Sequence, residues 1–168
     1  MTNSRHLNCP ATVFIVDDDP GVRQMIARMV RSVGLRPEPF ASVREFLELY
    51  DPDQPGCLVL DVRMPGESGL DLQDRLAEAG TGIPIIFITG HGSIPMSVRA
   101  MKRGAVEFLE KPFDDQDLLD AIQCALQRDA EQRRSEARRT DARKRLSRLT
   151  PRERQVMAFV VAGWANKE

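Results

Sequence analysis

Four short runs of this chain are apolar almost without interruption. They are TVFIV at 12–16, CLVL at 57–60, PIIFIT at 84–89 and AVEFL at 105–109. A strand with one face in water alternates apolar and polar residues, whereas a continuous apolar run is typical of a parallel strand that is covered on both faces. A fifth run, 35–40, contains two prolines. This predicts an edge strand, because proline cannot donate to the hydrogen-bond ladder.

The stretches between these runs have helical periodicity. Asp19-Pro20 combines an N-cap with a proline at the first helical position, and apolar residues then recur at helical spacing. Ser42 and Glu45 form a capping box before the second helix. Five strand–helix units in series predict an α/β fold with a doubly wound, five-stranded parallel sheet of the flavodoxin-like type. In such folds the ligand site lies beyond the carboxyl ends of the strands.

Charge is distributed unevenly along the chain. Residues 1–127 contain 12 basic and 19 acidic side chains, whereas residues 128–146 contain eight basic and four acidic ones. From 128 to 148 the helical composition continues without an apolar stripe. This predicts an exposed helical linker, and a weak heptad pattern leaves a coiled coil as the alternative. At 149–168 a capped helix with a new apolar stripe begins, which predicts the start of a further, all-α domain.

The composition also bears on where the protein is found. No apolar run approaches the roughly 18 residues of a membrane span, and the first ten residues lack the apolar stretch of a signal peptide. Cys9, Cys57 and Cys124 have neither the spacing of a disulfide framework nor that of a metal site. We therefore expect a cytoplasmic protein that makes no membrane contact.

Polar side chains follow the predicted strands at the points where the strands end. The first strand runs into Asp17 and Asp18, the third ends at Asp61, the fourth ends at Thr89, and Lys111 follows the fifth. Because the carboxyl ends of parallel strands meet at one edge of a sheet, we expect these side chains to converge. Clustered carboxylates repel one another unless a cation neutralises them, and Mg²⁺ prefers such oxygen ligands. An ammonium and a hydroxyl complete a set suited to phosphoryl transfer onto an aspartate.

Two other activities are compatible with the same architecture. A flavin binder needs a phosphate loop rich in donors after the first strand, where this chain has the acidic run 17–19. A phosphatase of the haloacid dehalogenase type needs a second aspartate two positions after the nucleophile, where this chain has Arg63. We therefore expect no turnover of an external substrate, so the chain is not an enzyme beyond catalysing its own phosphorylation and dephosphorylation.

Four segments resemble the signature segments of two-component response-regulator receivers. They are IVDDD at 15–19, LVLDVRMPGESG at 58–69, FITGHG at 87–92 and EFLEKPF at 107–113, within a resemblance that covers residues 12 to about 127. The stretch 149–168 resembles the opening of a LuxR-type helix-turn-helix domain. Together the two parts resemble the FixJ-type class of transcriptional regulators, near its styrene-responsive member.

This resemblance implies a role for each acidic residue at the strand ends. Asp61 matches the phosphoacceptor of the family. Asp18 matches the direct Mg²⁺ ligand, and Asp17 matches the second acid, which often acts through water. The backbone carbonyl of Arg63 matches the group that completes the metal shell.

The resemblance also covers the fourth and fifth strands. Thr89 and Lys111 match the hydroxyl and the ammonium that contact the phosphoryl group. Thr89 and Phe108 match the switch residues, although Phe108 is equally well explained as a core residue of its strand. The family has a cis bond at the position of Lys111–Pro112. His91 is either close enough to the site to influence an attacking water or a loop residue that faces solvent.

The partners are likewise implied by the resemblance. A sensor histidine kinase would donate the phosphoryl group, and phosphorylation would produce a homodimer that brings two DNA-binding domains together. LuxR-type domains have four helices, of which 149–168 covers only the first and the beginning of the second. We therefore expect a truncated form of a longer protein, which binds DNA through the full-length output domain but not through these 168 residues. The alternative is a receiver that acts only as a protein-interaction module without DNA output.

Overall fold

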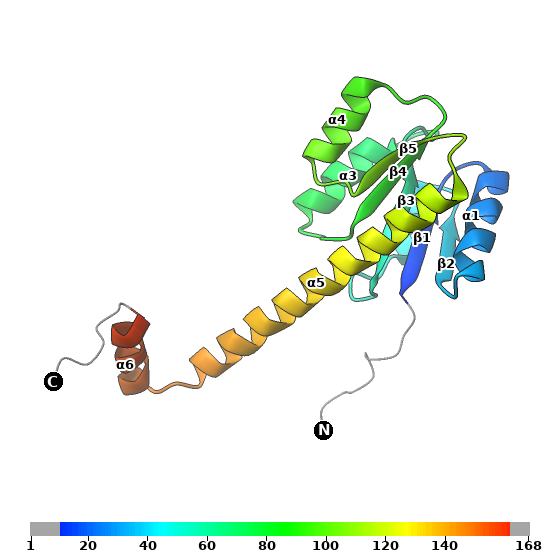
Figure 1. Cartoon of the computed structure of the whole chain (residues 1–168). Coiled ribbons are helices and arrows are strands. Elements are labelled where there is room, and N and C mark those ends of the chain that lie inside the picture. Colours follow the sequence, from blue (N-terminus) through cyan, green and yellow to red (C-terminus); the bar gives the residue numbers. More distant parts are fainter. Residues whose placement is uncertain (1–10, 162–168) are drawn as a thin grey trace. The chain divides into compact units, whose positions relative to one another are not determined.

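The structure is a computed structural model, and it describes residues 11–161. The chain forms two compact units that divide between Ala130 and Glu131. In the first unit strands and helices alternate (Figure 1): β1 Thr12–Val16, α1 Pro20–Ser32, β2 Arg36–Phe40, α2 Val43–Leu49, β3 Gly56–Asp61, α3 Gly69–Glu78, β4 Ile85–Thr89, α4 Ile94–Lys102 and β5 Glu107–Glu110. Helix α5, Asp115–Ser147, begins in the first unit and continues into the second, where α6, Pro151–Val161, follows.

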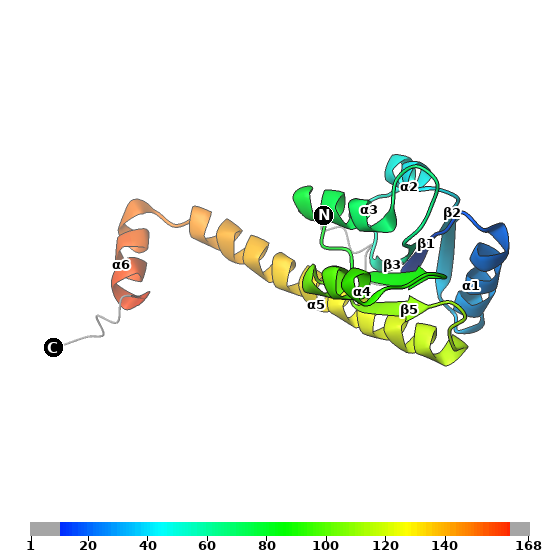
Figure 2. The ribbon, with the colours of Figure 1, turned by 90° about the horizontal axis from the view of Figure 1, so that it is seen from above.

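The five strands form one parallel sheet in the order β2-β1-β3-β4-β5. This confirms the doubly wound fold predicted from the apolar runs. Strand β2 lies at one edge, as its prolines Pro37 and Pro39 predicted. Helices α1 and α5 cover one face of the sheet, and α2 and α3 cover the other (Figure 2).

The core has two layers because the inner strands are buried on both faces. Every residue of β1 is buried. Val13 and Ile15 point into the layer beneath α1 and α5, whereas Phe14 and Val16 point into the layer beneath α2, α3 and α4. Phe14 packs edge-on against Phe46 of α2 with ring centroids 6.0 Å apart. The continuous apolar runs are therefore explained by burial from both sides.

Strand β5 begins later than the apolar run predicted. The run starts at Ala105, but the strand starts at Glu107. Gly104 has a positive φ of 92°, and the amide of Ala105 donates to the carbonyl of Ala100 over 3.1 Å. This is the way in which a helix with a left-handed C-terminal residue satisfies its last carbonyls. Ala105 therefore belongs to the end of α4 rather than to the strand.

The helix starts agree with the caps read from the sequence. Asp19 is the N-cap of α1, and its carboxylate accepts hydrogen bonds from the amides of Gly21 and Val22. The hydroxyl of Ser42 accepts from the amide of Glu45 over 3.2 Å. The carboxylate of Glu45 accepts in return from the amide of the residue before the cap, Ala41, over 2.7 Å. Such caps satisfy amides that have no partner within the helix.

Helix α5 is attached to the sheet by a buried carboxylate. Asp129 is 6% exposed, and its Oδ2 accepts from the amide of Gly56 at the start of β3 over 3.1 Å. A Cβ at position 56 would lie 2.0 Å from the carbonyl oxygen of Thr12, so only glycine fits where β3 passes β1. The hydrogen bond from Gly56 positions the end of α5 that belongs to the first unit.

The second unit contains the remainder of α5 and helix α6. Asp141 and Arg145 form an ion pair of 2.8 Å at the i,i+4 spacing. Thr150 and Glu153 form a capping box at the start of α6, which agrees with the capped helix expected there. The residues of α6 up to Val160 are exposed. Cys9 and the last seven residues of the proposed 149–168 domain lie outside the described residues. None of the described helices has the length and apolar character needed to cross a membrane.

Candidate functional site

The residues at the strand ends lie where the sheet order predicts. Asp17 directly follows β1, Asp61 is the last residue of β3, Thr89 is the last residue of β4, and Lys111 directly follows β5. These four strands are neighbours in the sheet and run parallel. Their carboxyl ends therefore share one edge, and the predicted convergence is confirmed for Asp17, Asp61 and Lys111.

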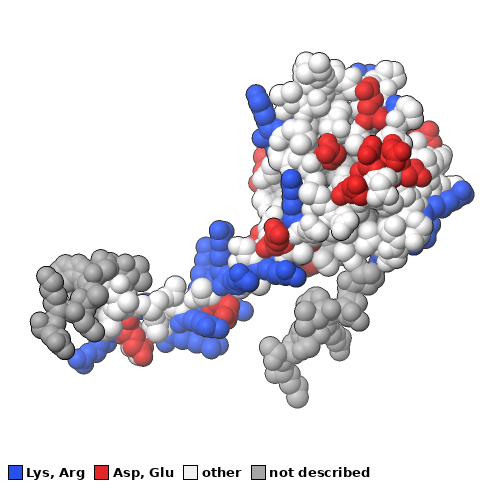
Figure 3. All heavy atoms as spheres, in the orientation of Figure 1, with Lys and Arg blue, Asp and Glu red and all other residues white. Residues whose placement is uncertain are grey.

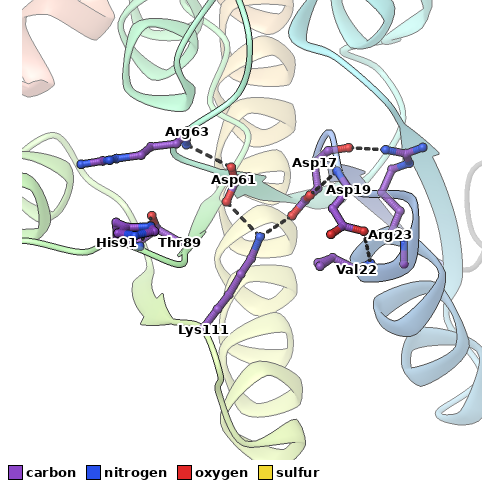
Figure 4. A network of polar contacts seen from close by, with 10 residues as sticks. Asp17, Asp19, Val22, Arg23, Asp61, Arg63, Thr89, His91 and Lys111 are labelled. Atoms are coloured by element: carbon purple, nitrogen blue, oxygen red, sulfur yellow. Dashed lines mark hydrogen bonds and ion pairs between the residues drawn. The ribbon is translucent and has the colours of Figure 1, made fainter.

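The ammonium of Lys111 lies between two carboxylates (Figure 4). Its Nζ is 2.6 Å from Asp17 Oδ2 and 3.0 Å from Asp61 Oδ1. Asp17 is 0% exposed and Asp61 4% exposed, so both carboxylates are removed from water. Ion pairs shielded in this way are screened by salt much less than those at the surface.

The second oxygen of each carboxylate accepts a backbone hydrogen bond. Asp61 Oδ2 accepts from the amide of Arg63 over 3.0 Å, and Asp17 Oδ1 accepts from the amide of Asp19 over 2.8 Å. The guanidinium of Arg23 in α1 also donates to the backbone carbonyl of Asp17 over 2.6 Å. Both carboxylates are thus fixed in orientation before any ligand binds.

Neighbouring charges and burial have opposing effects on the pKa values of Asp61 and Lys111. Burial raises the pKa of Asp61 above its ordinary value, because desolvation outweighs the opposing effect of Lys111, and the charge of Asp17 raises it further. Burial alone would lower the pKa of Lys111, but its hydrogen bonds to Asp17 and Asp61 outweigh this effect, so the pKa is raised. One ammonium therefore compensates two carboxylates incompletely.

Asp18 is not part of the buried cluster. It is exposed, whereas Asp17 beside it is buried. Within residues 11–161, no group of three or more His, Cys, Asp or Glu side chains is arranged to hold a metal ion. The expected ligands Asp17, Asp18 and Asp61 are therefore not assembled into such a group. The donor set still suits a hard cation, because two buried carboxylates share a single ammonium and their oxygens are the ligands that Mg²⁺ prefers.

Thr89 and Phe108 lie beside the cluster without joining it. Thr89 is buried, its hydroxyl oxygen accepts from the amide of His91 over 3.3 Å, and its carbonyl accepts from the amide of Lys111 over 2.7 Å. The ring of Phe108 is half-buried, and its centroid lies 6.2 Å from that of Phe87. The Lys111–Pro112 peptide bond is cis, as predicted.

Sequence reasoning missed two features that shape the site. One is Arg23, which donates to the backbone carbonyl of Asp17. A contact with a backbone group cannot be recognised from the residue types. The other is the close approach of α3 at Gly69, where a Cβ would lie 2.3 Å from the carbonyl oxygen of Asp61. The residue type does not reveal which backbone atom the glycine approaches; the three-dimensional structure does.

Space-filling representation shows acidic side chains gathered on one part of the first unit and basic side chains along the rest of α5 (Figure 3). This agrees with the acidic excess of residues 1–127 and the basic excess of residues 128–146. The excess of acidic charge and the excess of basic charge therefore lie in different parts of the chain.

Comparison with known proteins identifies the family. Residues 13–123 match the response regulator receiver domain. Nodulation protein W of Bradyrhizobium diazoefficiens is 51% identical over 158 residues, which are 94% of this chain and 70% of that protein. The transcriptional regulatory protein FixJ of Azorhizobium caulinodans is 46% identical over 155 residues, which are 92% of this chain and 74% of that protein.

A solved structure of the response regulator StyR superimposes with a TM-score of 0.86 at 50% sequence identity, and the match covers 92% of this chain and 78% of that one. Family match, sequence identity and three-dimensional likeness agree. The chain belongs to the response regulator receiver family, in its FixJ-type branch and close to StyR.

Proposed function

We propose that Asp61 accepts a phosphoryl group from a sensor histidine kinase and that this charge switches the output of the protein. The observation that carries the proposal is the geometry around Asp61. A buried carboxylate at the end of β3 has one oxygen 3.0 Å from the Lys111 ammonium and the other 3.0 Å from the amide of Arg63. Phosphoaspartate signalling is what membership of the receiver family implies.

The proposed chemistry is a nucleophilic displacement at phosphorus. An oxygen of Asp61 forms the new O–P bond while the N–P bond of the phosphohistidine breaks, and the electron pair of that bond remains on the imidazole. Burial raises the pKa of Asp61 and with it the basicity of the attacking oxygen. The Lys111 ammonium lies near enough to neutralise charge on the transferred group, and the hydroxyl of Thr89 is the donor that we assign to a phosphoryl oxygen.

We assign Asp17, Asp18, Asp61 and the backbone carbonyl of Arg63 as the groups that hold Mg²⁺. Bound Mg²⁺ would supply positive charge beside the phosphoryl oxygens. The incomplete compensation of two carboxylates by Lys111 supports the assignment. The exposure of Asp18 leaves its carboxylate accessible to an ion.

We further propose that the switch acts through Thr89 and Phe108. A new dianion at Asp61 would attract the Thr89 hydroxyl, and the half-buried Phe108 would fill the space behind it. The faces around 96–103 and 114–126 would then form a homodimer, and residues 149–168 would belong to the DNA-binding output domain. The relative FixJ is named a transcriptional regulatory protein, which supports an output in transcription.

Phosphorylation can be tested directly. With Mg²⁺ and a small phosphodonor, the chain should gain one phosphoryl group that is labile in acid and in base. Asp61→Asn should abolish the incorporation, because an amide is a poor nucleophile, whereas Asp115→Asn, at an exposed carboxylate of α5, should leave it unchanged. Undiminished incorporation in Asp61→Asn would exclude Asp61 as the acceptor.

The dimer is tested by sedimentation of the chain with and without phosphodonor at micromolar concentration. We expect a shift from monomer to dimer that Asp61→Asn lacks. Equal sedimentation in both conditions would show that phosphorylation acts in another way than by forming a dimer.

A further inference from the structure

Helix α4 is held to the body of the first unit by few apolar contacts. Ala100 is the only residue of α4 that is buried. Ile94, Val98 and Met101 are 80%, 44% and 43% exposed. A helix that buries so little is easily displaced unless polar contacts hold it.

Such polar contacts come from α3. Asp74 Oδ2 lies 3.1 Å from the guanidinium of Arg99, and Asp74 Oδ1 forms an ion pair with Arg103. Both oxygens of one carboxylate thus form ion pairs with two arginines four residues apart, Arg99 on α4 and Arg103 at its C-cap. All three side chains are partly exposed, so each pair by itself contributes little to stability. The shared carboxylate nevertheless connects the two helices at two points.

A buried amide adds a third connection. Gln73 is 4% exposed, and its Nε2 donates to the backbone carbonyl of Ala100 over 3.2 Å. The same carbonyl accepts from the amide of Ala105 at the end of α4. Gln73 Oε1 is buried and has no hydrogen-bond partner among the described residues. A buried acceptor without a donor is costly, so this amide does not make the fold more stable than an apolar side chain of the same size would.

We propose that Gln73 and Asp74 form an α3–α4 latch, a pair of positioning residues that hold α4 in its resting place and thereby oppose the phosphorylation-linked switch. Helix α4 starts five residues after Thr89, so a restraint on α4 also restrains the segment that carries the Thr89 hydroxyl. The latch itself is a property of the resting structure. Its effect on phosphorylation rests on the function proposed above.

The latch is tested first without any phosphodonor, by hydrogen exchange of the whole chain. Asp74→Asn removes both ion pairs, and Gln73→Met removes the amide at nearly constant volume. In each variant the amides of 94–103 should exchange about threefold faster, while those of 20–32 in α1 remain unchanged. Glu67→Gln is the matched control, because it removes the ion pair that Glu67 makes with Arg75 of α3 without touching α4.

A uniform rise in exchange over 20–32 and 94–103 would overturn the latch, because it would show a general loss of stability. Unchanged exchange over 94–103 in both variants would overturn it as well. Thermal unfolding separates the cases further. Gln73→Met also removes an unpaired buried acceptor, so its midpoint should lie close to that of the parent chain.

The second arm measures the initial rate of phosphoryl incorporation from a small phosphodonor with Mg²⁺. Asp74→Asn and Gln73→Met should incorporate the phosphoryl group about threefold faster than Glu67→Gln, because α4 is displaced more easily from its resting position. Equal rates would overturn the proposal that the latch opposes the switch. If neither the parent chain nor any variant incorporates phosphate, the proposed function fails, while faster exchange over 94–103 would still establish the latch.

Discussion

The ammonium of Lys111 lies 2.6 Å from Asp17 Oδ2, although the two residues are 94 positions apart in the chain. Lys111 follows β5 and Asp17 follows β1, and two further strands, β3 and β4, separate β1 from β5 in the sheet. The lysine side chain therefore spans those strand ends. The same ammonium also donates to Asp61 Oδ1, at the end of β3.

Replacing Lys111 should destabilise the protein more than replacing an exposed lysine. Lys111→Met leaves two buried carboxylates without a cation, which should lower the free energy of unfolding at pH 7 by about 2 kcal/mol. Lys102→Met in α4 is the control, because Lys102 is exposed. Denaturant unfolding measures both. Equal, small effects would show that the bridge contributes nothing to stability.

The stability difference between the parent chain and Lys111→Met should also depend on pH. The folded-state pKa of Lys111 is raised above 10.5. Its contribution to stability is therefore fully present below pH 10.5 and is lost as the pH rises through the raised pKa. The difference in unfolding free energy between the parent chain and Lys111→Met should accordingly be constant at neutral pH and shrink under alkaline conditions. A difference that grows with pH would contradict the bridge.

Asp61→Asn should leave the protein at least as stable as the parent chain. Burial raises the pKa of Asp61, so the ionised group is unfavourable in the folded state at pH 7. Asparagine keeps an acceptor for the amide of Arg63 and leaves Lys111 paired with Asp17. We expect a gain of up to about 1 kcal/mol at pH 7. A loss of more than that amount would show that the carboxylate is structural.

The gain from Asp61→Asn should depend on pH in a defined direction. The folded parent chain binds the Asp61 proton more tightly than the unfolded chain does. Protonation therefore favours the fold as the pH falls from neutrality through the raised pKa towards 3.8. The advantage of Asp61→Asn should shrink over this range. Unfolding curves of both proteins at matched pH values measure the difference, and an advantage that increases towards acid pH would reverse our assignment.

The two neighbouring acids at the end of β1 should behave differently on mutation. Asp17 is buried and accepts from Lys111 and from the amide of Asp19. Asp17→Ala should therefore cost about 1–3 kcal/mol, because the amide of Asp19 loses its acceptor and the Lys111 ammonium keeps only one of its two carboxylates, Asp61. Asp18→Ala should change stability by less than about 0.5 kcal/mol, since Asp18 is exposed. Thermal unfolding in metal-free buffer checks this, and equal effects would contradict the distinction.

Gly69→Ala should disturb the loop after β3. An added Cβ would meet the carbonyl oxygen of Asp61 at 2.3 Å, and a backbone atom cannot yield as a flexible side chain can. Overpacking of this kind costs about 1–3 kcal/mol. Gly90→Ala is the control, because nothing lies within 4 Å of a Cβ there. A stable Gly69→Ala variant would mean that α3 can move away from the site without loss.

The sequence predicted the fold because its signals are local and repeated. Each inner strand is a continuous apolar run, and the first two helices begin at recognisable caps, Asp19 and Ser42. The predicted start of β5 at Ala105 was wrong, because the amide of Ala105 donates to the carbonyl of Ala100 in α4. That bond competes with the strand in a way that residue types alone do not reveal.

The sequence predicted which residues of the candidate site lie close together. Strand ends in a parallel sheet share an edge, so Asp17, Asp61 and Lys111 were expected on the same edge, where the long Lys111 side chain can reach both carboxylates. The orientation of adjacent residues was not predictable in the same way. Asp17 and Asp18 have identical side chains, and only the turn of the backbone after β1 makes one buried and the other exposed. Contacts between helices, such as that of Gln73 with Ala100, could not be predicted, because no spacing in the sequence indicates them.

The late position of Lys111 in the chain has a consequence for biosynthesis. Translation produces β1, β3 and β4 before residue 111, so a nascent sheet can assemble while its two buried carboxylates still lack their counter-ion. The last strand, β5, then brings the missing charge when it adds to the edge of the sheet. The order of translation thus delays completion of the cluster of Asp17, Asp61 and Lys111 until the last strand of the sheet is present. A chain that ends before residue 111 therefore leaves the carboxylates of Asp17 and Asp61 without their shared ammonium.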